Sequence, residues 1–238
     1  MARTVVVAGV GPGLGASLAR KFSNEGCDVA SFARTEEYIG ELAEDLDGPG
    51  DGLAVPVDLR EPEEVRQAFD TVRGFFGSID VLVYNASSAS WRGLMDTTED
   101  EFENAWKVNQ RGAFVCAQEA VGDMRDEDGG TVIFTGATSA VRSRGGAISF
   151  TAGKFGARGM AMDIAQEYGD EGVHAAHVVV DGQIDNPRTR DHHPDRDDDT
   201  FLDPDDIADT YCHLVEQDAS TQAFEVHLTN GPQTTEFL

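Results

Sequence analysis

The chain has 238 residues, of which 40% are hydrophobic, and its 44 acidic residues outnumber its 18 basic ones to give a formal net charge of −26. The ordinary apolar content excludes a disordered chain, and the length suits one large α/β domain. A surface this acidic argues against binding to nucleic acid or to anionic membranes, because both carry negative charge.

The acidic residues are spread over many segments, and lysines are few: Lys21, Lys107 and Lys154. Such self-repulsion destabilises a compact fold at low salt and is screened at high salt. We therefore expect a halophilic protein; the alternative is an acidic protein from an ordinary cell. The chain shows neither a signal peptide nor an apolar run near the roughly 20 residues that cross a bilayer, so we expect a cytoplasmic location.

Seven short β-branched runs alternate with amphipathic segments. Their near-continuous apolar character is typical of strands buried on both faces. This alternation predicts an α/β fold with a doubly wound, Rossmann-type parallel sheet of seven strands and helices on both faces. No linker composition interrupts residues 1–238, so we expect a single domain. The expected strands are 3–8, 28–33, 53–57, 79–84, 131–135, 173–180 and 223–229.

Helix starts are recognisable between these runs. Thr35 can cap the helix that follows it, and Pro62 fits a first turn. Thr98 and Glu101 have the spacing of a capping box. Asp203 opens the last helix.

One polar segment, at about 182–205, breaks the rhythm. A structureless stretch of that length in a compact domain is usually a lid or a binding loop. His192 and His193 lie there among aspartates, but their spacing matches no known metal ligand pattern, so we favour a solvated acidic loop. The cysteines are odd in number and far apart, which predicts reduced thiols and neither a disulfide framework nor a metal site. They are Cys27, Cys116 and Cys212.

A glycine cluster follows the first strand. Gly9, Gly13 and Gly15, with Leu14 between the last two, form the pattern G-x-x-x-G-x-G, and an amphipathic helix follows. Glycines there allow a tight turn and close approach of the backbone to a pyrophosphate, while the helix N-terminus offers free N–H groups. The cluster in this position predicts a dinucleotide cofactor.

The end of the second strand bears on which dinucleotide is bound. An acidic residue there would bind the ribose 2′-hydroxyl of NAD, but Ala33 holds that position and Arg34 follows. An arginine can pair with a 2′-phosphate, so we favour NADP(H) over NAD(H). The alternative is that Arg34 is only a surface cation at a strand end.

Taken together, these motifs resemble the short-chain dehydrogenase/reductase family over nearly the whole chain. Beyond the glycine loop, the resemblance implies an adenine-contacting pair, a signature after the fourth strand, an active-site asparagine, a lysine that binds the nicotinamide ribose, and a segment after the sixth strand. Those positions are, in order, Asp58 and Leu59, Asn85 and Ala86, Asn109, Lys154, and Gly182 and Ile184.

The chain departs from the family where the proton is handled. Phe150 stands at the position of the family's catalytic tyrosine, four residues before Lys154 on one helical face. Ala137 stands at the position of the serine, and Asp181 at that of a proline. The cofactor-holding half of the family's machinery is therefore present, and the proton-handling half is altered at both members.

Phenylalanine has no titratable proton, and a general acid typically contributes roughly 10²–10⁴ in rate. We rank a water relayed through Lys154 and Asn109 first as the substitute, and hydroxyls of the loop at Thr138 and Ser139 second. Asn109 has an equal structural reading, as a buried asparagine that bridges backbone segments. We expect Tyr84 and His177 to pack in the core.

Three functions remain open. The first is an NADP(H)-dependent oxidoreductase that acts on a small carbonyl or alcohol by a non-standard proton route. The second is a catalytically weak or inactive NADP-binding protein with a sensing or structural role. The third is a non-redox reaction in the same pocket. The pocket would be lined by Ser87–Trp91 and Ala137–Ser143, with a floor apolar enough for an apolar part of a ligand. The resemblance also implies a homodimer or homotetramer built through helices at 99–125 and 147–169.

Overall fold

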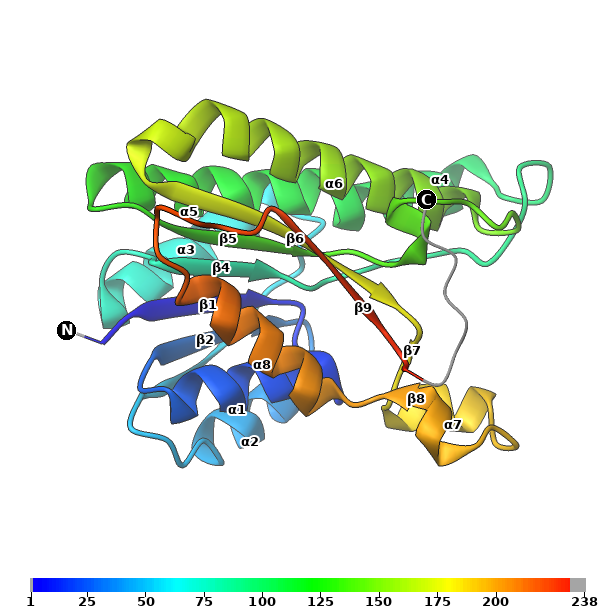
Figure 1. Cartoon of the computed structure of the whole chain (residues 1–238), viewed down its shortest axis with the longest axis horizontal. Helices are drawn as coiled ribbons and strands as arrows, with labels where there is room; N and C mark the ends of the chain where they lie inside the picture. The colour runs from blue at the N-terminus through cyan, green and yellow to red at the C-terminus, as the bar shows by residue number, and fades with distance from the viewer. Residues whose placement is uncertain (1, 232–238) are drawn as a thin grey trace.

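The computed structural model describes residues 2–231, and its centre is a seven-stranded parallel sheet with the order β3-β2-β1-β4-β5-β6-β9 (Figure 1). The sequence prediction of a doubly wound parallel sheet is confirmed, and each expected run forms a strand within about two residues of its expected bounds. The strands are β1 (Thr4–Ala8), β2 (Asp28–Ala33), β3 (Gly52–Pro56), β4 (Val81–Tyr84), β5 (Gly130–Thr135), β6 (Val173–Asp181) and β9 (Glu225–Thr229).

Helices cover both faces of this sheet. One face packs against α1 (Leu14–Asn24), α2 (Glu36–Glu44) and α8 (Pro204–Val215). The other face packs against α3, α5 and α6, with α4 beside α6. These four helices are α3 (Pro62–Phe76), α4 (Glu99–Trp106), α5 (Ala113–Asp126) and α6 (Ile148–Tyr168).

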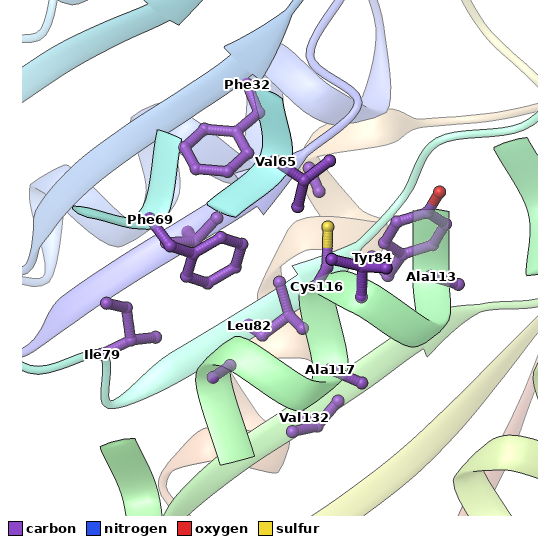
Figure 2. Close-up of a cluster of buried hydrophobic side chains, with 14 of the residues drawn as sticks. Phe32, Val65, Phe69, Ile79, Leu82, Tyr84, Ala113, Cys116, Ala117 and Val132 are labelled. Atoms are coloured by element: carbon purple, nitrogen blue, oxygen red, sulfur yellow. The ribbon is translucent and has the colours of Figure 1, made fainter. Parts of the chain in front are cut away.

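The second of these faces holds the larger buried cluster (Figure 2). Phe32 of β2 and Phe69 of α3 meet edge to face, with ring centroids 5.4 Å apart. Cys116 and Leu82 are fully buried in the same cluster. The cluster fixes α3 and α5 on the sheet and so sets where the loops at its carboxyl edge begin.

The four predicted helix starts are confirmed. Glu101 N donates to Thr98 Oγ1 at 3.2 Å while Thr98 N donates to Glu101 Oε2 at 2.9 Å, which completes the capping box. Asp203 accepts from the amide of Asp205, and Pro62 begins α3. Thr35 occupies the cap position of α2 as expected, but its side chain forms no cap hydrogen bond. The two glutamates of the first turn of α2 instead complement the helix dipole there.

The helix expected at 99–125 is interrupted by a π-helix at Lys107–Gly112. At Gly112 the backbone lies so close to β3 and β4 that an added Cβ would be 2.5 Å from Leu59 O. Gln110 Nε2 also donates to Gly153 O of α6 at 2.7 Å. A π-bulge widens one helical turn, a feature frequent at functional sites, and here that turn contains the buried Asn109.

The segment at 182–205, which we term the lid segment, has secondary structure, so the expectation of a structureless stretch was wrong. It contains β7 (Gln183–Ile184), α7 (Pro187–His192), a 3₁₀ turn at Asp198–Thr200, and β8 (Phe201–Leu202), and β7 pairs with β8 in a small parallel sheet. It lies beyond the carboxyl ends of the main strands (Figure 1).

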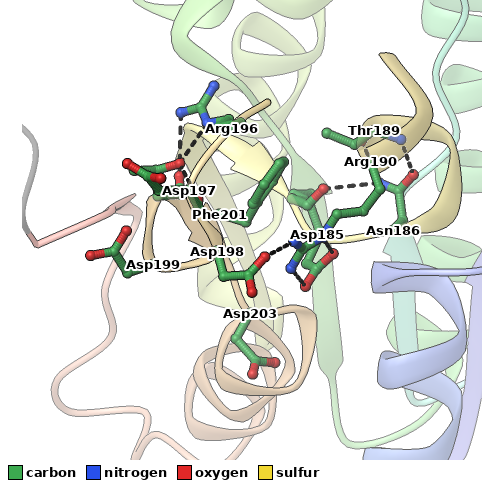
Figure 3. A network of polar contacts seen from close by, with 12 residues as sticks. Asp185, Asn186, Thr189, Arg190, Arg196, Asp197, Asp198, Asp199, Phe201 and Asp203 are labelled. Atoms are coloured by element: carbon green, nitrogen blue, oxygen red, sulfur yellow. Dashed lines mark hydrogen bonds and ion pairs between the residues drawn. The ribbon is translucent and has the colours of Figure 1, made fainter. Parts of the chain in front are cut away.

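Two arginines organise this acidic segment (Figure 3). The guanidinium of Arg190 binds both oxygens of Asp185, at 2.7 and 2.6 Å, and contacts Asp198 as well. Arg190 and Arg196 both lie over the ring of the buried Phe201, at 4.3 and 5.3 Å from its centroid. Two aspartates of this acidic segment are thus compensated by Arg190 within the segment itself.

None of the helices in the described part of the chain is long and apolar enough to cross a membrane. Within residues 2–231, no group of three or more histidine, cysteine or acidic residues is placed to hold a metal ion. The three cysteines are free and buried.

Candidate active site

The glycine loop after β1 is built on close backbone contacts. Gly9 and Gly13 have positive φ angles of +101° and +122°, which side-chain-bearing residues rarely adopt. A Cβ added at Gly9 would lie 2.4 Å from Ala86 N, and one added at Gly15 would lie 2.8 Å from Gly9 O. Asn85 Nδ2 donates to Gly9 O at 2.8 Å. Gly9 and Gly15 of the loop are thereby brought together with Asn85 and Ala86, which follow β4.

This turn leads directly into α1, which begins at Leu14 and carries no acidic residue in its first turn. The first N–H groups of a helix have no partner within it, and the dipole there favours negative charge. The loop and the helix start therefore fit a pyrophosphate.

The ends of β2 and β3 bring Arg34 and Asp58 together. Arg34 is exposed, and its charge helps to hold the pKa of the Asp58 carboxyl below its usual value, although the hydrogen bonds from Arg60 contribute more. Arg60 Nε lies 3.0 Å from both carboxylate oxygens of Asp58. Leu59 between them is buried. Sequence reasoning missed this role of Arg60, for which the i, i+2 spacing of opposite charges was the available signal.

Lys154 is the buried cation of the site, with 5% of its surface exposed. Its Nζ donates to Thr135 O, at the end of β5, at 2.7 Å and lies 5.6 Å from the centroid of the Phe150 ring. Among residues 2–231 it forms no ion pair. Burial lowers the pKa of Lys154 from 10.5 to about 8, because the charged amine is taken out of water.

Asn109 is fully engaged with one neighbour. Its Nδ2 donates to Ser88 O at 2.7 Å, and its Oδ1 accepts from Ser88 N at 2.9 Å. α6 comes close at Gly153, where an added Cβ would lie 2.6 Å from Nδ2. Of the two readings of Asn109, this geometry favours the structural one, in which the side chain fixes the loop after β4.

Phe150, at the position of the family's tyrosine, forms an aromatic pair with Trp91. Phe150 packs on Trp91, with ring centroids 5.0 Å apart and the planes tilted by 47°. Trp91 is 67% exposed. Beside this pair the hydroxyls of Ser149 and Ser90 lie 3.1 Å apart and hydrogen-bond to each other. The position of the family's tyrosine is therefore aromatic, with a hydrogen-bonded pair of hydroxyls beside it.

The serine position leads into a polar cluster that sequence reasoning missed. Ala137 is extended and precedes the 3₁₀ turn Thr138–Ala140, which also contains Ser139. The hydroxyl of Thr138 donates to the carboxylate of Asp181, and Arg142 pairs with the same carboxylate at 2.6 Å. Asp181, standing in place of a proline, thus ties the loop after β5 to the end of β6.

The lid segment reaches the glycine loop. A Cβ added at Gly13 would lie 2.9 Å from the Cβ of Asn186, which caps α7 by accepting from Thr189 N. Gly182 lies against Leu202, and Ile184 packs on the core beneath α8. Asn186 carried no motif in the sequence, so its place beside the loop was not foreseen.

Tyr84 and His177 are core residues, as expected. The Tyr84 hydroxyl donates to Val108 O, and burial raises the pKa of that phenol well above its usual value. His177 Nδ1 lies 2.9 Å from Glu225 Oε2, and burial lowers the pKa of the imidazole. Its Nε2 has no hydrogen-bond partner among the described residues.

The fold and the glycine loop define a dinucleotide-binding α/β protein. The family model for short chain dehydrogenases matches residues 3–196. The chain belongs to the short-chain dehydrogenase/reductase family.

Named relatives lie in the same family. The 3-oxoacyl-[acyl-carrier-protein] reductase MabA of Mycobacterium bovis is 34% identical over 191 residues, covering 80% of this chain and 72% of the relative. The 3-oxoacyl-[acyl-carrier-protein] reductase FabG of Staphylococcus aureus is 29% identical over 186 residues, covering 77% and 75%. The named relatives are thus oxidoreductases.

Solved structures share the fold at lower identity. L-sorbose reductase of Gluconobacter frateurii, complexed with NADPH and L-sorbose, superposes with a TM-score of 0.89 at 22% identity over 99% of this chain and 98% of the other. The alcohol dehydrogenase of Thermococcus sibiricus, complexed with 5-hydroxy-NADP, gives 0.88 at 20% identity with full coverage of both chains. A 3-ketoacyl-(acyl-carrier-protein) reductase of Brucella melitensis, complexed with NADH, gives 0.85 at 20% over 96% and 97%.

Proposed function

We propose that this protein is an NADP(H)-dependent oxidoreductase that interconverts a carbonyl and an alcohol by a proton route that uses no tyrosine. The observation that carries the proposal is Lys154, an amine kept buried at the end of β5 in a chain with three lysines. A buried lysine without a counter-ion is costly to the fold, so a functional reason for it is favoured over a structural one.

The residues proposed to hold the cofactor lie along the carboxyl edge of the sheet. When bound, NADP(H) supplies or accepts the hydride. The glycine loop and the start of α1 would hold the pyrophosphate, β2 and β3 the adenosine half, and α6 with the segment after β6 the nicotinamide half. The set is Gly9, Gly13, Leu14, Gly15, Arg34, Asp58, Leu59, Asn85, Ala86, Lys154, Gly182 and Ile184.

The preference for NADP(H) rests on the charge at the ends of β2 and β3. Arg34 is an exposed cation in a chain of net charge −26. The carboxylate of Asp58 is compensated by Arg60, which removes a repulsion against a 2′-phosphate. A phosphate that enters here would meet two guanidinium groups.

The substrate is proposed to present an apolar part to the pocket. The hydroxyl of Thr138 donates a hydrogen bond to Asp181, and the hydroxyls of Ser90 and Ser149 are hydrogen-bonded to each other. The ring of Trp91 is exposed and packs on Phe150. Aromatic faces recognise apolar groups by area and dispersion.

The protein is also proposed to form a homodimer or homotetramer. α4, α5 and α6 expose several large apolar side chains, and a patch of that kind usually marks an interface. These residues are Phe102, Trp106, Phe114, Phe155 and Met162.

Cofactor binding is tested by titrating NADPH and NADH, followed by nicotinamide fluorescence in molar potassium chloride. We expect tighter binding of NADPH, and loss of that preference in Arg34→Ala, while the control Arg66→Ala, on α3 and paired with Glu63, keeps it. Tighter binding of NADH by the wild type would contradict the preference. Binding of NADPH with no consumption on any carbonyl would instead support a catalytically weak or inactive NADP-binding protein.

A further inference from the structure

We propose that Lys154 is the general acid of the reaction, and that its ammonium gives a proton directly to the substrate oxygen during reduction. The inference rests on the proposed function, because it assigns the proton step of that reaction. It differs from a phenol-centred mechanism, in which a lysine assists a tyrosine.

Four candidate donors near Lys154 already have hydrogen-bond partners within the protein. The Tyr84 hydroxyl donates to Val108 O, and that of Thr138 donates to Asp181. Ser149 is paired with Ser90. His177 is held in the core by Glu225 and is wholly buried. The hydroxyls of Tyr84 and Thr138 would have to break a bond in the protein before they could donate to a substrate.

Lys154 differs from them in its unused capacity. An ammonium carries three N–H donors, and one of them is used by Thr135 O at 2.7 Å. Phe150 offers a ring 5.6 Å away and no donor or acceptor that would compete for the substrate oxygen. The amine therefore keeps hydrogens for an oxygen placed on the Phe150 side.

The surroundings of Lys154 also suit an acid at neutral pH. Among the segments packed on α6, β6 carries His177 and Asp181, and the π-helix carries Lys107 and Arg111. The acidic residues of α4 lie on its exposed surface and in its capping box. Asp181 is held by Arg142, and no carboxylate among residues 2–231 pairs with Lys154.

Burial then lowers the pKa of Lys154 to about 8, with no opposing carboxylate. Burial also lowers the pKa of the neighbouring His177, so this imidazole is neutral at pH 8 and does not change the pKa of Lys154. General acids work best when their pKa lies near the operating pH.

The step balances without a further reactant. As the carbonyl carbon gains the hydride, its oxygen takes the Nζ proton, one N–H bond breaks and one O–H bond forms. Lys154 is left as a neutral amine, which water reprotonates. In the oxidation direction the neutral amine takes the alcohol proton.

The first test needs neither substrate nor cofactor. Wild-type protein is labelled with trace acetic anhydride across a pH series in molar potassium chloride, and the extent of acetylation of each lysine is read by mass spectrometry. We expect Lys154 to become reactive with a midpoint near pH 8, and Lys21 at much higher pH, since its ion pairs with Glu25 and Asp209 raise its pKa. A Lys154 midpoint at or above that of Lys21 would overturn the proposal.

The second test is chemical rescue. Lys154→Ala is assayed with the carbonyl that the wild type reduces fastest, with methylamine and weaker primary amines added, and Lys21→Ala is the matched control. We expect turnover to fall at least 100-fold and to be restored by amines in proportion to their acidity. A lysine needed only for ribose binding would show lost NADPH affinity with no dependence on amine pKa, and that result would refute the proposal.

Failure of the acid role of Lys154 and failure of the proposed function give different results. Turnover by Lys154→Ala at the wild-type rate without amine would overturn the role of Lys154 and leave the oxidoreductase in place. Absence of NADPH consumption by the wild type would overturn the proposed function itself, whatever the labelling shows.

Discussion

Lys154→Met should change stability in a pH-dependent way that can be worked out from the structure. In the folded protein Lys154 loses its proton near pH 8, whereas in the unfolded chain it keeps the proton up to its usual pKa of 10.5. Between these values the unfolded state binds more protons, so wild-type stability rises with pH. A shift of about 2.5 units at 1.36 kcal/mol per unit gives a gain of about 3 kcal/mol across the window.

The assay is urea unfolding at constant molar potassium chloride, from about pH 7 to about pH 10.5. The free energy of unfolding of the wild type, minus that of Lys154→Met, should rise by about 3 kcal/mol over this range. The matched control is Lys21→Met, whose difference should stay flat across it, because the pKa of Lys21 is raised. A flat difference for Lys154→Met would refute the claim that a charged amine is buried at neutral pH.

Three further outcomes are expected. Dilution from molar to about 0.1 M potassium chloride should lower the melting temperature by scanning calorimetry, because repulsion among the 44 acids is then less screened; an unchanged value would contradict the halophilic reading. Asn109→Ala should cost about 1–3 kcal/mol in urea unfolding by leaving the backbone of Ser88 unpaired, whereas the exposed Asn24→Ala should cost almost nothing. Trp106→Glu with Phe155→Glu should shift the mass by light scattering to that of a monomer, and an unchanged mass would place the interface elsewhere.

The sheet was predictable from the sequence because its inner strands are buried on both faces. Runs such as Thr4–Ala8 and Val81–Tyr84 are buried at every position and almost wholly apolar, so they stand out without an alignment. The capping box at Thr98 was equally readable, because its partners are three residues apart. The lid segment was not, since its order depends on Arg190 reaching Asp185 and Asp198 and on Phe201 between two guanidinium groups.

Within the candidate site, residues that belong to sequence motifs were predicted, whereas side-chain pairings between distant or unpatterned residues were not. Lys154 and the glycines were found by spacing. Three pairings depend on how the loops after the strands are arranged. They are Asn109 with Ser88, Asp58 with Arg60, and Thr138 with Asp181. These pairings change the chemistry, because they remove the asparagine amide and the loop hydroxyl from the set of free donors.

The most direct test of the central claim is consumption of NADPH by the wild type in molar potassium chloride, measured with a panel of alkyl and aryl ketones and 1,2-diketones. We expect NADPH consumption that depends on the added carbonyl compound and is fastest with the compounds that carry an apolar group. NADPH that binds but is not consumed with any of them would contradict it.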